Sequence, residues 1–488
     1  MIIYPFPEHY EKKSNAFSVN CDGKTIGVYA CDVSAVPLNQ VWPGYQRPFD
    51  QTEPTSYVSL GSDGAFTLNI TPAAPFETVT VRPLSRSITP QINAGTVSVT
   101  FPGPGQYSVE FDGMHHVLTV FANPEKDFGI TPEDENVLYF APGVHFLEEV
   151  VELDDNCTVY LANGSVVYGG FKAAEKHNIR VIGYGILDNS NIERGKGTPF
   201  LFSHCENVLV EGVTVVNSAA WSIHFSGCTN VTVENIKLIG MWRYNSDGCD
   251  FTNCTHAVLR NSYLRNYDDC VVIKGLSGNR ELPVSDIRVE HCVLWCDWGR
   301  ALEIGAETSA PSISGVRFTD CDIIHGDAVM MDIQHGDRAL ISDILFQNIR
   351  AEYMAKANAG KLQTAPGEVY VNPDENFMPS LFILVTLRTI YSRDDITGNI
   401  SGVHFKDISV TTEDGRVPPS CIAATAPDTV IENIVFENIV INGKACKTLD
   451  ALNLTVSGAD GAVLPPSSIT SGDDKPQKGG TVRDIVLR

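Results

Sequence analysis

The chain lacks any uninterrupted hydrophobic run long enough to cross a bilayer, which needs about 20 apolar residues. It is also poor in positive charge, because 35 Lys and Arg stand against 59 Asp and Glu, for a formal net charge of -24. Such a charge repels nucleic acid, anionic lipid and other polyanions at long range. We therefore expect no nucleic acid or membrane partner, and a neutral ligand is favoured.

Motifs of several function classes are missing as well. The 488 residues contain no Gly-rich phosphate loop, no G-x-S-x-G elbow and no H-E-x-x-H pair. The 13 cysteines are an odd number, and the closest pairs, Cys249 with Cys254 and Cys292 with Cys296, do not match the paired C-x-x-C spacing of zinc sites. We expect reduced thiols in the core, no metal site and no cofactor.

The opening run from Met1 to Pro7 reaches Glu8 without a basic region followed by a long apolar region. This pattern predicts no secretory signal, and hence a cytoplasmic location. The oligomeric state does not follow from the sequence.

Short alternating runs broken by turn residues fill the first part of the chain, for example Phe66 to Ile70 and Thr96 to Phe101. They predict an antiparallel β-sandwich domain over residues 1–125. The Pro-Gly-Pro-Gly stretch at 102–105 is interpreted as a hairpin connection to the next strand, Tyr107 to Phe111. Loop composition up to Glu135 then marks a boundary, with a second domain over residues 136–488.

The second part repeats a unit that starts with a polar residue or Gly and continues with β-branched residues. The starts are nearly evenly spaced, except for one gap of double length that holds one unit plus an insertion at 352–399. This regular recurrence of short β segments predicts an all-β fold in which a parallel β-helix follows the sandwich. A mobile loop is expected at 458–480. The units begin at Asn178, Asn207, Asn230, His256, Asp286, Gly315, Asp343, Gly402 and Glu432.

Two neighbouring units carry Asp247, in Asn-Ser-Asp-Gly, and Asp268-Asp269, in Tyr-Asp-Asp-Cys. The step that lays Asp247 on Asp268 also lays Cys249 on Cys270. Since residues of successive coils lie about 4.8 Å apart, the three aspartates should meet on one patch of surface. A lone Asp-Asp pair in a turn is usually solvated surface, and the coil alignment favours a site instead.

Extending the alignment to neighbouring coils brings further polar and aromatic side chains into one column. It lays Trp221 on Asp247, Asp269 on Arg300, Glu303 on Asp332, His224 on Asp250 and Lys274 on Gly305. Clustered carboxylates cannot all ionise easily, so one should hold a proton while others stay charged, as acetal hydrolysis requires. Arg300 and Lys274 can neutralise this column, and His224, His325 and His335 can equally be structural. The expected column holds Trp221, Asp247, Asp268, Asp269, Arg300 and Glu303, with Asp327, Asp332 and His335 on the coil beyond.

The motifs Asn245 to Gly248 and Tyr267 to Lys274, with Asn217 to His224 before them, resemble glycoside hydrolase family 28, of the polygalacturonase-like, right-handed, pectin-lyase-like β-helix glycosidases. The resemblance covers residues 137–440. Catalytic roles then fall to Asp247, Asp268 and Asp269. An oligosaccharide or polysaccharide substrate is expected to contact Trp221, His224, Arg243, Asp250, Tyr267, Lys274, Trp298, Arg300, Glu303, Asp332 and His335.

Two departures from the family pattern concern the substrate. Arg300 stands where family 28 carries a histidine, and Met331 to Gln334 replaces the Arg-Ile-Lys motif that holds galacturonate carboxylates. Asp332 at that position would repel a uronate. The sandwich, with Val81 to Arg86 and Leu118 to Pro124, is more similar to family 49, the dextranase and isopullulanase group.

The family 49 resemblance implies an inverting hydrolase of a neutral α-linked glycan, with Asp268 as general acid and with Asp247 and Asp269 positioning and deprotonating water. An exo-acting polygalacturonase-like hydrolase is the alternative, and it would need Arg243, Lys274 or Arg300 to bind a carboxylate. A lyase or epimerase on the same scaffold is also possible. A hypothesis of another class is a carbohydrate-binding β-helix without turnover.

Overall fold

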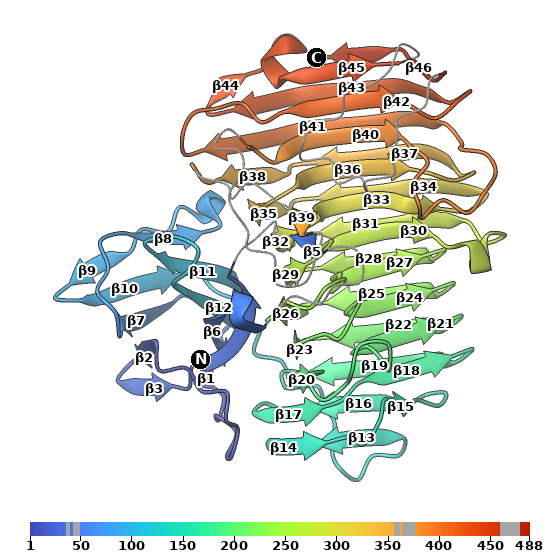
Figure 1. The fold of residues 1–488 in the computed structure, drawn as a ribbon. Coiled ribbons are helices and arrows are strands. Elements are labelled where there is room, and N and C mark those ends of the chain that lie inside the picture. The colour runs from blue at the N-terminus through green and yellow to red at the C-terminus, as the bar shows by residue number, and fades with distance from the viewer. Residues whose placement is uncertain (36–39, 42–48, 356–361, 364–376, 459–478) are drawn as a thin grey trace.

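The computed structural model describes residues 1–35, 40–41, 49–355, 362–363, 377–458 and 479–488. A stack of parallel coils runs from residue 137 to the C-terminus, and the N-terminal strands lie against one side of it (Figure 1). The fold prediction, an antiparallel β-sandwich followed by a right-handed parallel β-helix, is confirmed. Two stretches of the insertion at 352–399, residues 356–361 and 364–376, and nearly all of the expected loop at 458–480 lie outside the described residues.

Two sheets form the N-terminal part, and all their strand pairs are antiparallel except β12 with β6. Their facing sides enclose Val19, Leu60, Leu68, Val97 and Val120, each fully buried. The first sheet holds β1 (Ile2–Ile3), β4 (Tyr29–Ser34), β6 (Thr52–Gly61), β8 (Val79–Arg82), β11 (Gly105–Phe111) and β12 (Val117–Asn123). The second holds β2 (Phe17–Cys21), β3 (Lys24–Ile26), β7 (Phe66–Pro72), β9 (Gln91–Asn93) and β10 (Thr96–Phe101).

The predicted hairpin at 102–105 is wrong. β10 pairs with β7 and β9, whereas β11 pairs with β12 and β8 in the other sheet. The Pro-Gly-Pro-Gly stretch therefore crosses between the two layers. A turn-forming sequence alone does not distinguish this connection from a hairpin, because both reverse the chain within a few residues.

Three strands per coil build the β-helix, two in one long sheet and one in a second sheet. The 23-stranded sheet contains β13 (Val137–Phe140), β14 (Gly143–Phe146), β16 (Thr158–Leu161), β17 (Ser165–Tyr168), β19 (His177–Gly183), β20 (Ile186–Asp188), β22 (Glu206–Glu211), β23 (Thr214–Val216), β25 (Thr229–Glu234), β26 (Lys237–Ile239), β28 (Thr255–Arg260), β29 (Tyr263–Tyr267), β31 (Val284–Glu290), β32 (Val293–Trp298), β34 (Ser312–Thr319), β35 (Asp322–Gly326), β37 (Leu340–Gln347), β38 (Arg350–Tyr353), β41 (Ile400–Thr412), β43 (Val430–Ile441), β44 (Lys444–Ala445), β46 (Thr481–Val482) and β47 (Ile485–Leu487).

The second, 11-stranded sheet carries most of the polar side chains of interest below. It contains β15 (Val151–Glu152), β18 (Phe171–Ala174), β21 (Phe200–Ser203), β24 (Ile223–Ser226), β27 (Cys249–Thr252), β30 (Val271–Gly275), β33 (Arg300–Thr308), β36 (Val329–His335), β40 (Ser380–Thr386), β42 (Ser420–Ala424) and β45 (Leu454–Ser457). The remaining elements are the pair β5 (Gln40–Val41) and β39 (Leu362–Gln363) and the short 3-10 turns η1 (Phe49–Gln51), η2 (Leu84–Arg86), η3 (Ser277–Asn279) and η4 (Asp450–Leu452).

The backbone conformation explains which residue types begin each repeat unit. Its first residue adopts a left-handed conformation in unit after unit, with φ of 58° at Asn178, 60° at Asn207 and 55° at both Asn230 and His256. Asn, Asp and Gly tolerate this conformation, which is why these residue types recur there. The predicted alignment of unit starts holds except for the last, since Gly402 lies opposite Asn433 and not Glu432.

Identical side chains stack inside the coils. Phe202, Phe225 and Phe251 form a ladder with centroids 5.4 Å apart at each step. The thirteen cysteines, all in described residues, are free, and twelve of them are buried. The expectation of reduced core thiols is confirmed. No helix among the described residues is long and apolar enough to span a membrane.

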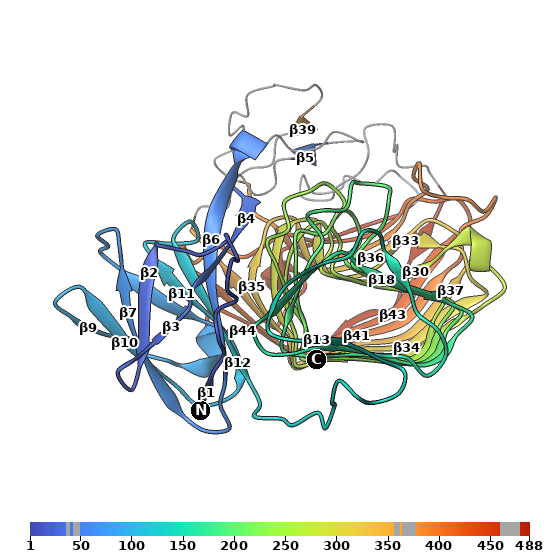
Figure 2. The same ribbon diagram turned by 90° about the horizontal axis from the view of Figure 1, so that it is seen from below.

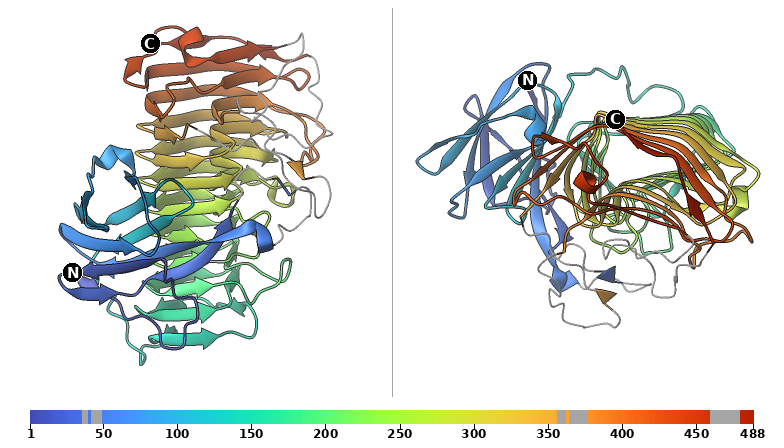
Figure 3. Two further views of the ribbon diagram at one scale, coloured as in Figure 1. Left: turned by 60° about the vertical axis from the view of Figure 1, so that its left-hand side comes forward. Right: turned by 90° about the horizontal axis from the view of Figure 1, so that it is seen from above.

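The sandwich lies beside the coils along their length and does not cap one end (Figures 2 and 3). A shared apolar cluster joins the two, including Tyr57 and Phe121 from the sandwich and Tyr263 and Trp295 from the β-helix. Arg82 adds buried ion pairs, with its Nε 3.0 Å from Glu110 and its Nη1 2.5 Å from Glu352. The division into domains 1–125 and 136–488 stays a prediction.

Candidate active site

Strand pairing sets which side chains meet. Ile223 lies opposite Cys249, Val271 opposite Leu302 and Glu303 opposite Asp332, in the register that the coil alignment predicts. His224 lies opposite Asp250, also as predicted. Lys274 lies where the register between β30 and β33 shifts, so its predicted pairing with Gly305 does not appear among the paired residues.

The predicted alignment of Asp247 with Asp268 is wrong by one position. Cys249 pairs with Val271 and not with Cys270, and the Gly248 amide donates to the carbonyl of Asp269 at 2.8 Å. Asp247 therefore aligns with Asp269, and Asp268 is the residue added to the turn. The repeated Asp-x-Cys sequence produced the wrong alignment because backbone hydrogen bonds, and not residue identity, decide the register.

The three aspartates nevertheless gather at one turn of the helix and are buried, with 1%, 5% and 5% exposure for Asp247, Asp268 and Asp269. Asn245 donates to Asp247 at 3.1 Å. The backbone amide of Asp269 donates to the Asp268 carboxylate at 3.1 Å. The backbone amide of Arg300 donates to the Asp269 carboxylate at 2.8 Å. Each carboxylate is thus oriented by a polar hydrogen.

Lys274 neutralises one side of the cluster. Its ammonium lies 3.4 Å from Asp247, 3.7 Å from Asp250 and 3.7 Å from Glu307. The same nitrogen sits 4.2 Å from the centroid of the Trp221 ring, a cation–π contact. Trp221 therefore lies beside the aspartates, as its coil position predicts.

Arg300 neutralises the other side. Its guanidinium lies 3.2 Å from Asp332, 3.5 Å from Asp269 and 3.9 Å from Glu303. It also donates to the side chain of Gln334 at 2.8 Å. Each of the two cations therefore faces three carboxylates, which leaves the site strongly acidic.

Burial and mutual repulsion raise the proton affinity of these carboxyl groups. Burial, with the charges of Asp247 and Asp269, raises the pKa of Asp268 well above its usual range, although Arg300 and Lys274 oppose the shift. Burial raises the pKa of Asp247 to about 7 against the pull of Lys274, and that of Asp332 to about 7 against the pull of Arg300. The site can hold a carboxylic acid beside ionised carboxylates at neutral pH.

These shifts predict that the protein becomes less stable as pH rises from 5 to 8. Asp247 and Asp332 keep their protons to about pH 7 in the native state but lose them near pH 4 when unfolded. The native state therefore binds more protons in this window, and the free energy of unfolding falls with rising pH. We expect Tm to drop by about 2–4 °C, measured by calorimetry at constant ionic strength.

The variant Asp247→Asn provides the control, because it removes one of the two titrating groups and should flatten this slope. A Tm that rose between pH 5 and pH 8 would contradict the assigned protonation. At lower pH an opposite contribution appears, because His325 and Arg82, despite burial, hold the pKa of Glu110 at about 2. Stability from that carboxylate is lost only as pH falls below about 4.

His224 lies next to Trp221, with ring centroids 4.8 Å apart, and its Nε2 is 3.0 Å from the hydroxyl of Thr252. Burial and the nearby Lys274 lower the pKa of His224 to about 3. The ring is therefore neutral at physiological pH and can act only as a hydrogen-bonding or packing group. Asp250 is buried beneath it and has a pKa raised well above its usual range by burial and by Asp247.

Several predicted substrate contacts are wrong. Tyr267 and Trp298 lie inside the coil, with rings 5.8 Å apart in the apolar core. His335 is fully buried, its Nδ1 2.8 Å from the Thr308 hydroxyl, and it supports a turn. Strand residues alternate between the interior and the outside, so a shift of one position decides whether a ring can reach a ligand.

Three further residues of the predicted site interact with groups outside the aspartate cluster. His325 is 2.7 Å from Glu110 of the sandwich, and Asp327 lines a small cavity beside it. Arg243 donates to the backbone carbonyls of Ile192 at 3.0 Å and Ser190 at 3.2 Å, so it holds a neighbouring turn. No sequence pattern indicates which flank of the coil the sandwich covers.

Residues absent from the sequence-based site complete its wall. Glu307 pairs with Lys274, and Tyr391 is near enough to Tyr244 and Asp268 that burial and these groups raise the pKa of its phenol strongly. Arg194 stacks on the Tyr244 ring at 4.5 Å and donates to Asn245 at 3.3 Å. Glu307 follows the register shift in β33, and Arg194 and Tyr391 lie in turns. The coil repeat does not predict the positions of such residues.

The part of the chain that holds this cluster matches a known family. The model of glycosyl hydrolases family 28 matches residues 175–358, which include all three aspartates, Lys274 and Arg300. The chain is a polygalacturonase-like glycoside hydrolase. Acetal hydrolysis requires a carboxylic acid and a carboxylate, and the buried cluster contains carboxyl groups that could take both roles.

Similar proteins extend the match beyond the central coils. A probable endopolygalacturonase D of Neosartorya fischeri is 23% identical over 460 residues, which cover 89% of this glycosidase and 83% of the relative. A probable polygalacturonase of Arabidopsis thaliana is 28% identical over 172 residues, 33% of this chain and 36% of the relative.

Among solved structures, Dex49A from Penicillium minioluteum superposes with a TM-score of 0.67 at 16% identity. The match covers 94% of this glycosidase and 97% of that chain. It therefore includes both the sandwich and the β-helix, and it shows that the two parts share their arrangement with that protein.

Proposed function

We propose that this glycosidase hydrolyses a neutral α-linked oligosaccharide or polysaccharide with inversion of anomeric configuration. The observation that carries the proposal is the charge of the site: Lys274 and Arg300 each already face three carboxylates. A uronate carboxylate placed there would meet Glu303, Asp332 or Glu307 at close range. Like charges in a buried site repel strongly, so a neutral sugar is the better ligand.

In the proposed mechanism, Asp268 donates its proton to the leaving oxygen. Its raised pKa keeps that proton available at neutral pH. Asp269, held by the backbone amide and guanidinium of Arg300, deprotonates the attacking water, and Asp247 helps to orient that water. Trp221, beside Lys274, offers a flat apolar face to a sugar ring.

The second candidate is an exo-acting hydrolase of pectin oligosaccharides, favoured by the family 28 match and by the names of the relatives. It needs a cation that can bind a uronate. Lys274 and Arg300 are shared among carboxylates, and Arg243 is bound to backbone carbonyls. Arg194, stacked on Tyr244 at the edge of the cluster, is the side chain best placed for this role.

One substrate comparison separates the two functions. We expect the wild-type protein to release reducing sugar from a neutral α-glucan panel and not from oligogalacturonides. Proton NMR during the first turnovers should show a product of inverted anomeric configuration. Faster cleavage of oligogalacturonides, or a product that retains configuration, would contradict the proposal. An unsaturated product that absorbs in the ultraviolet would instead identify a lyase.

A further inference from the structure

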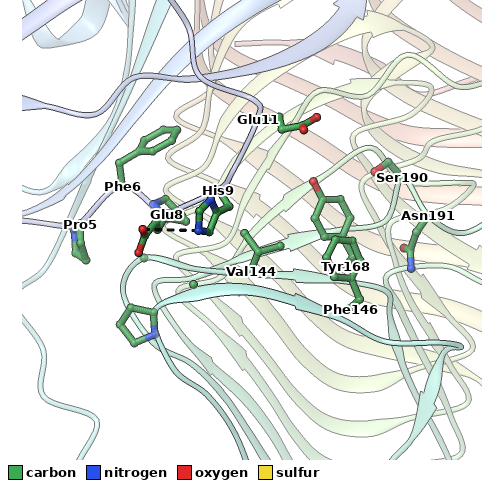
Figure 4. A pocket seen from close by; sticks show the side chains of 14 residues that line it. Pro5, Phe6, Glu8, His9, Glu11, Val144, Phe146, Tyr168, Ser190 and Asn191 are labelled. Carbon is green, nitrogen blue, oxygen red and sulfur yellow. Dashed lines mark ion pairs between the residues drawn. The ribbon is translucent and has the colours of Figure 1, made fainter.

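A hollow of about 950 Å³ lies where the N-terminal segment meets the first coils of the β-helix (Figure 4). Its floor carries Phe146 and Tyr168, whose rings are parallel within 4° and 4.7 Å apart. Phe146 is 72% exposed, although it belongs to a strand of the β-helix. Exposed apolar side chains that lie together in one patch, as these two rings do, are typical of a surface that binds a ligand or a partner.

The stack follows directly from the coil repeat. Phe146, at the end of β14, is the register partner of Tyr168, at the end of β17. Residues paired in this way lie one strand spacing apart, about 4.8 Å, which matches the separation of the rings. The platform is therefore rigid, because the backbone of two coils holds it.

Polar groups surround the platform. Glu8, Glu11, Ser190 and Asn191 line the same hollow, and the side chain of Asn191 donates to the Leu147 carbonyl at 3.2 Å. Glu11 lies close to the phenol of Tyr168, whose pKa is raised to about 12 by burial and by the charges of Asp188 and Glu11. An apolar floor with hydrogen-bonding acceptors and an amide at the rim suits a hydroxyl-rich ligand with a flat apolar face.

The hollow is linked to the catalytic cluster along one edge of the β-helix. Register partners run from Tyr168 through Asp188 and Val216 to Ile239, the last strand residue before the turn that carries Asp247. Phe146 is thus four coils from that turn, about 19 Å along the axis. Ser190 lines the hollow, and its carbonyl accepts from Arg243 in the turn before Asp247.

We propose that this hollow is a remote binding site for the same neutral polysaccharide chain that the catalytic aspartates cleave. This inference rests on the proposed function. The occupant is a neutral glycan because the rim carboxylates Glu8 and Glu11 repel a polyuronate, and because the distance requires a chain of several sugar units. The site would favour long substrates over short oligosaccharides.

The test compares Phe146→Ala with the wild-type protein on a polymeric neutral α-glucan and on the shortest oligosaccharide of the same linkage that is cleaved. Loss of the ring should lower kcat/KM about tenfold on the polymer, mainly through KM, and leave the short substrate unchanged. Leu340→Ala is the matched control, since Leu340 is a 57% exposed apolar side chain away from the hollow. Equal losses on both substrates, or none, would overturn the proposal.

A binding experiment keeps this proposal separate from the proposed function. Affinity electrophoresis compares migration in gels that contain soluble dextran, soluble starch or polygalacturonate. We expect a neutral glucan to retard the variant Asp268→Asn, and we expect this retardation to disappear in the double variant Asp268→Asn with Phe146→Ala. The remote-site proposal is overturned if neither neutral glucan retards the protein, or if polygalacturonate retards it in a way that depends on Phe146. Cleavage of a neutral glucan with Phe146-independent binding would leave the proposed function standing alone. Dimers that dissociate in Phe146→Ala with unchanged kinetics would show an interface between copies instead.

Discussion

Replacing Asp268 with Asn is expected to lower kcat on the natural glycan by about 10²–10⁴-fold, because an amide cannot donate the proton that the leaving oxygen needs. Asn matches Asp in size, so the buried turn should fold unchanged. Rates are measured by release of reducing sugar under saturating substrate. The alkaline limb of the wild-type pH profile should lie above the usual carboxyl range, since the pKa of Asp268 is raised.

The role of Asp268 as an acid can be separated from a role as a base. Aryl glycosides with acidic leaving groups need little protonation, so Asp268→Asn should retain much of its activity on them, whereas Asp269→Asn should lose activity on both substrate types. Asp286→Asn is the matched control, because Asp286 is exposed and lies away from the aspartate cluster. Its backbone has a left-handed conformation, which Asn also adopts. Undiminished turnover by Asp268→Asn on the natural glycan would show that another group is the acid.

Replacing Arg300 with Met is expected to destabilise the protein by about 3–5 kcal/mol and to abolish most activity. The guanidinium side chain is only 11% exposed and faces Asp269, Glu303 and Asp332. Without it, buried carboxylates repel one another with no compensating charge. Urea unfolding at pH 7 measures the loss, which should shrink at pH 5, because the raised pKa values of Glu303 and Asp332 keep these two carboxyl groups protonated there.

Two further variants provide comparisons for the loss of stability in Arg300→Met. Arg300→Lys should lie between wild type and Arg300→Met, because a single ammonium cannot reach Asp332, Asp269 and Gln334 together. Arg317→Met removes an exposed pair with Asp343, 2.7 Å apart, and should cost less than about 1 kcal/mol. If Arg300→Met were no more costly than Arg317→Met, Arg300 would not be the main counter-charge of the site.

Local pattern was enough to predict much of this fold. The β-branched units with a polar or Gly residue at their start predicted the parallel β-helix, and the left-handed backbone at Asn178, Asn207 and Asn230 explains that residue choice. The alternating runs before residue 120 predicted the sandwich. The error at 102–105 came from a turn whose residues are compatible with either a hairpin or a crossing between layers.

The site was predicted less completely. Spacing brought Asp247, Asp268 and Asp269 together because coils of similar length stack in register, and the structure places all three in one buried cluster. The aromatic contacts Tyr267 and Trp298 were wrong because their side chains alternate into the core. Glu307, Arg194 and Tyr391 were missed because irregular segments bring them to the site.

Residue type and period alone are sufficient to predict the repeated coil, the sandwich before it and the proximity of three acidic side chains. Three features became visible only in the folded chain: the register of Asp247 with Asp269, the sharing of Lys274 and Arg300 among six carboxylates, and the side of the coil that the sandwich covers. Those features depend on backbone hydrogen bonds and turn lengths between segments far apart in the chain, and no local pattern encodes them.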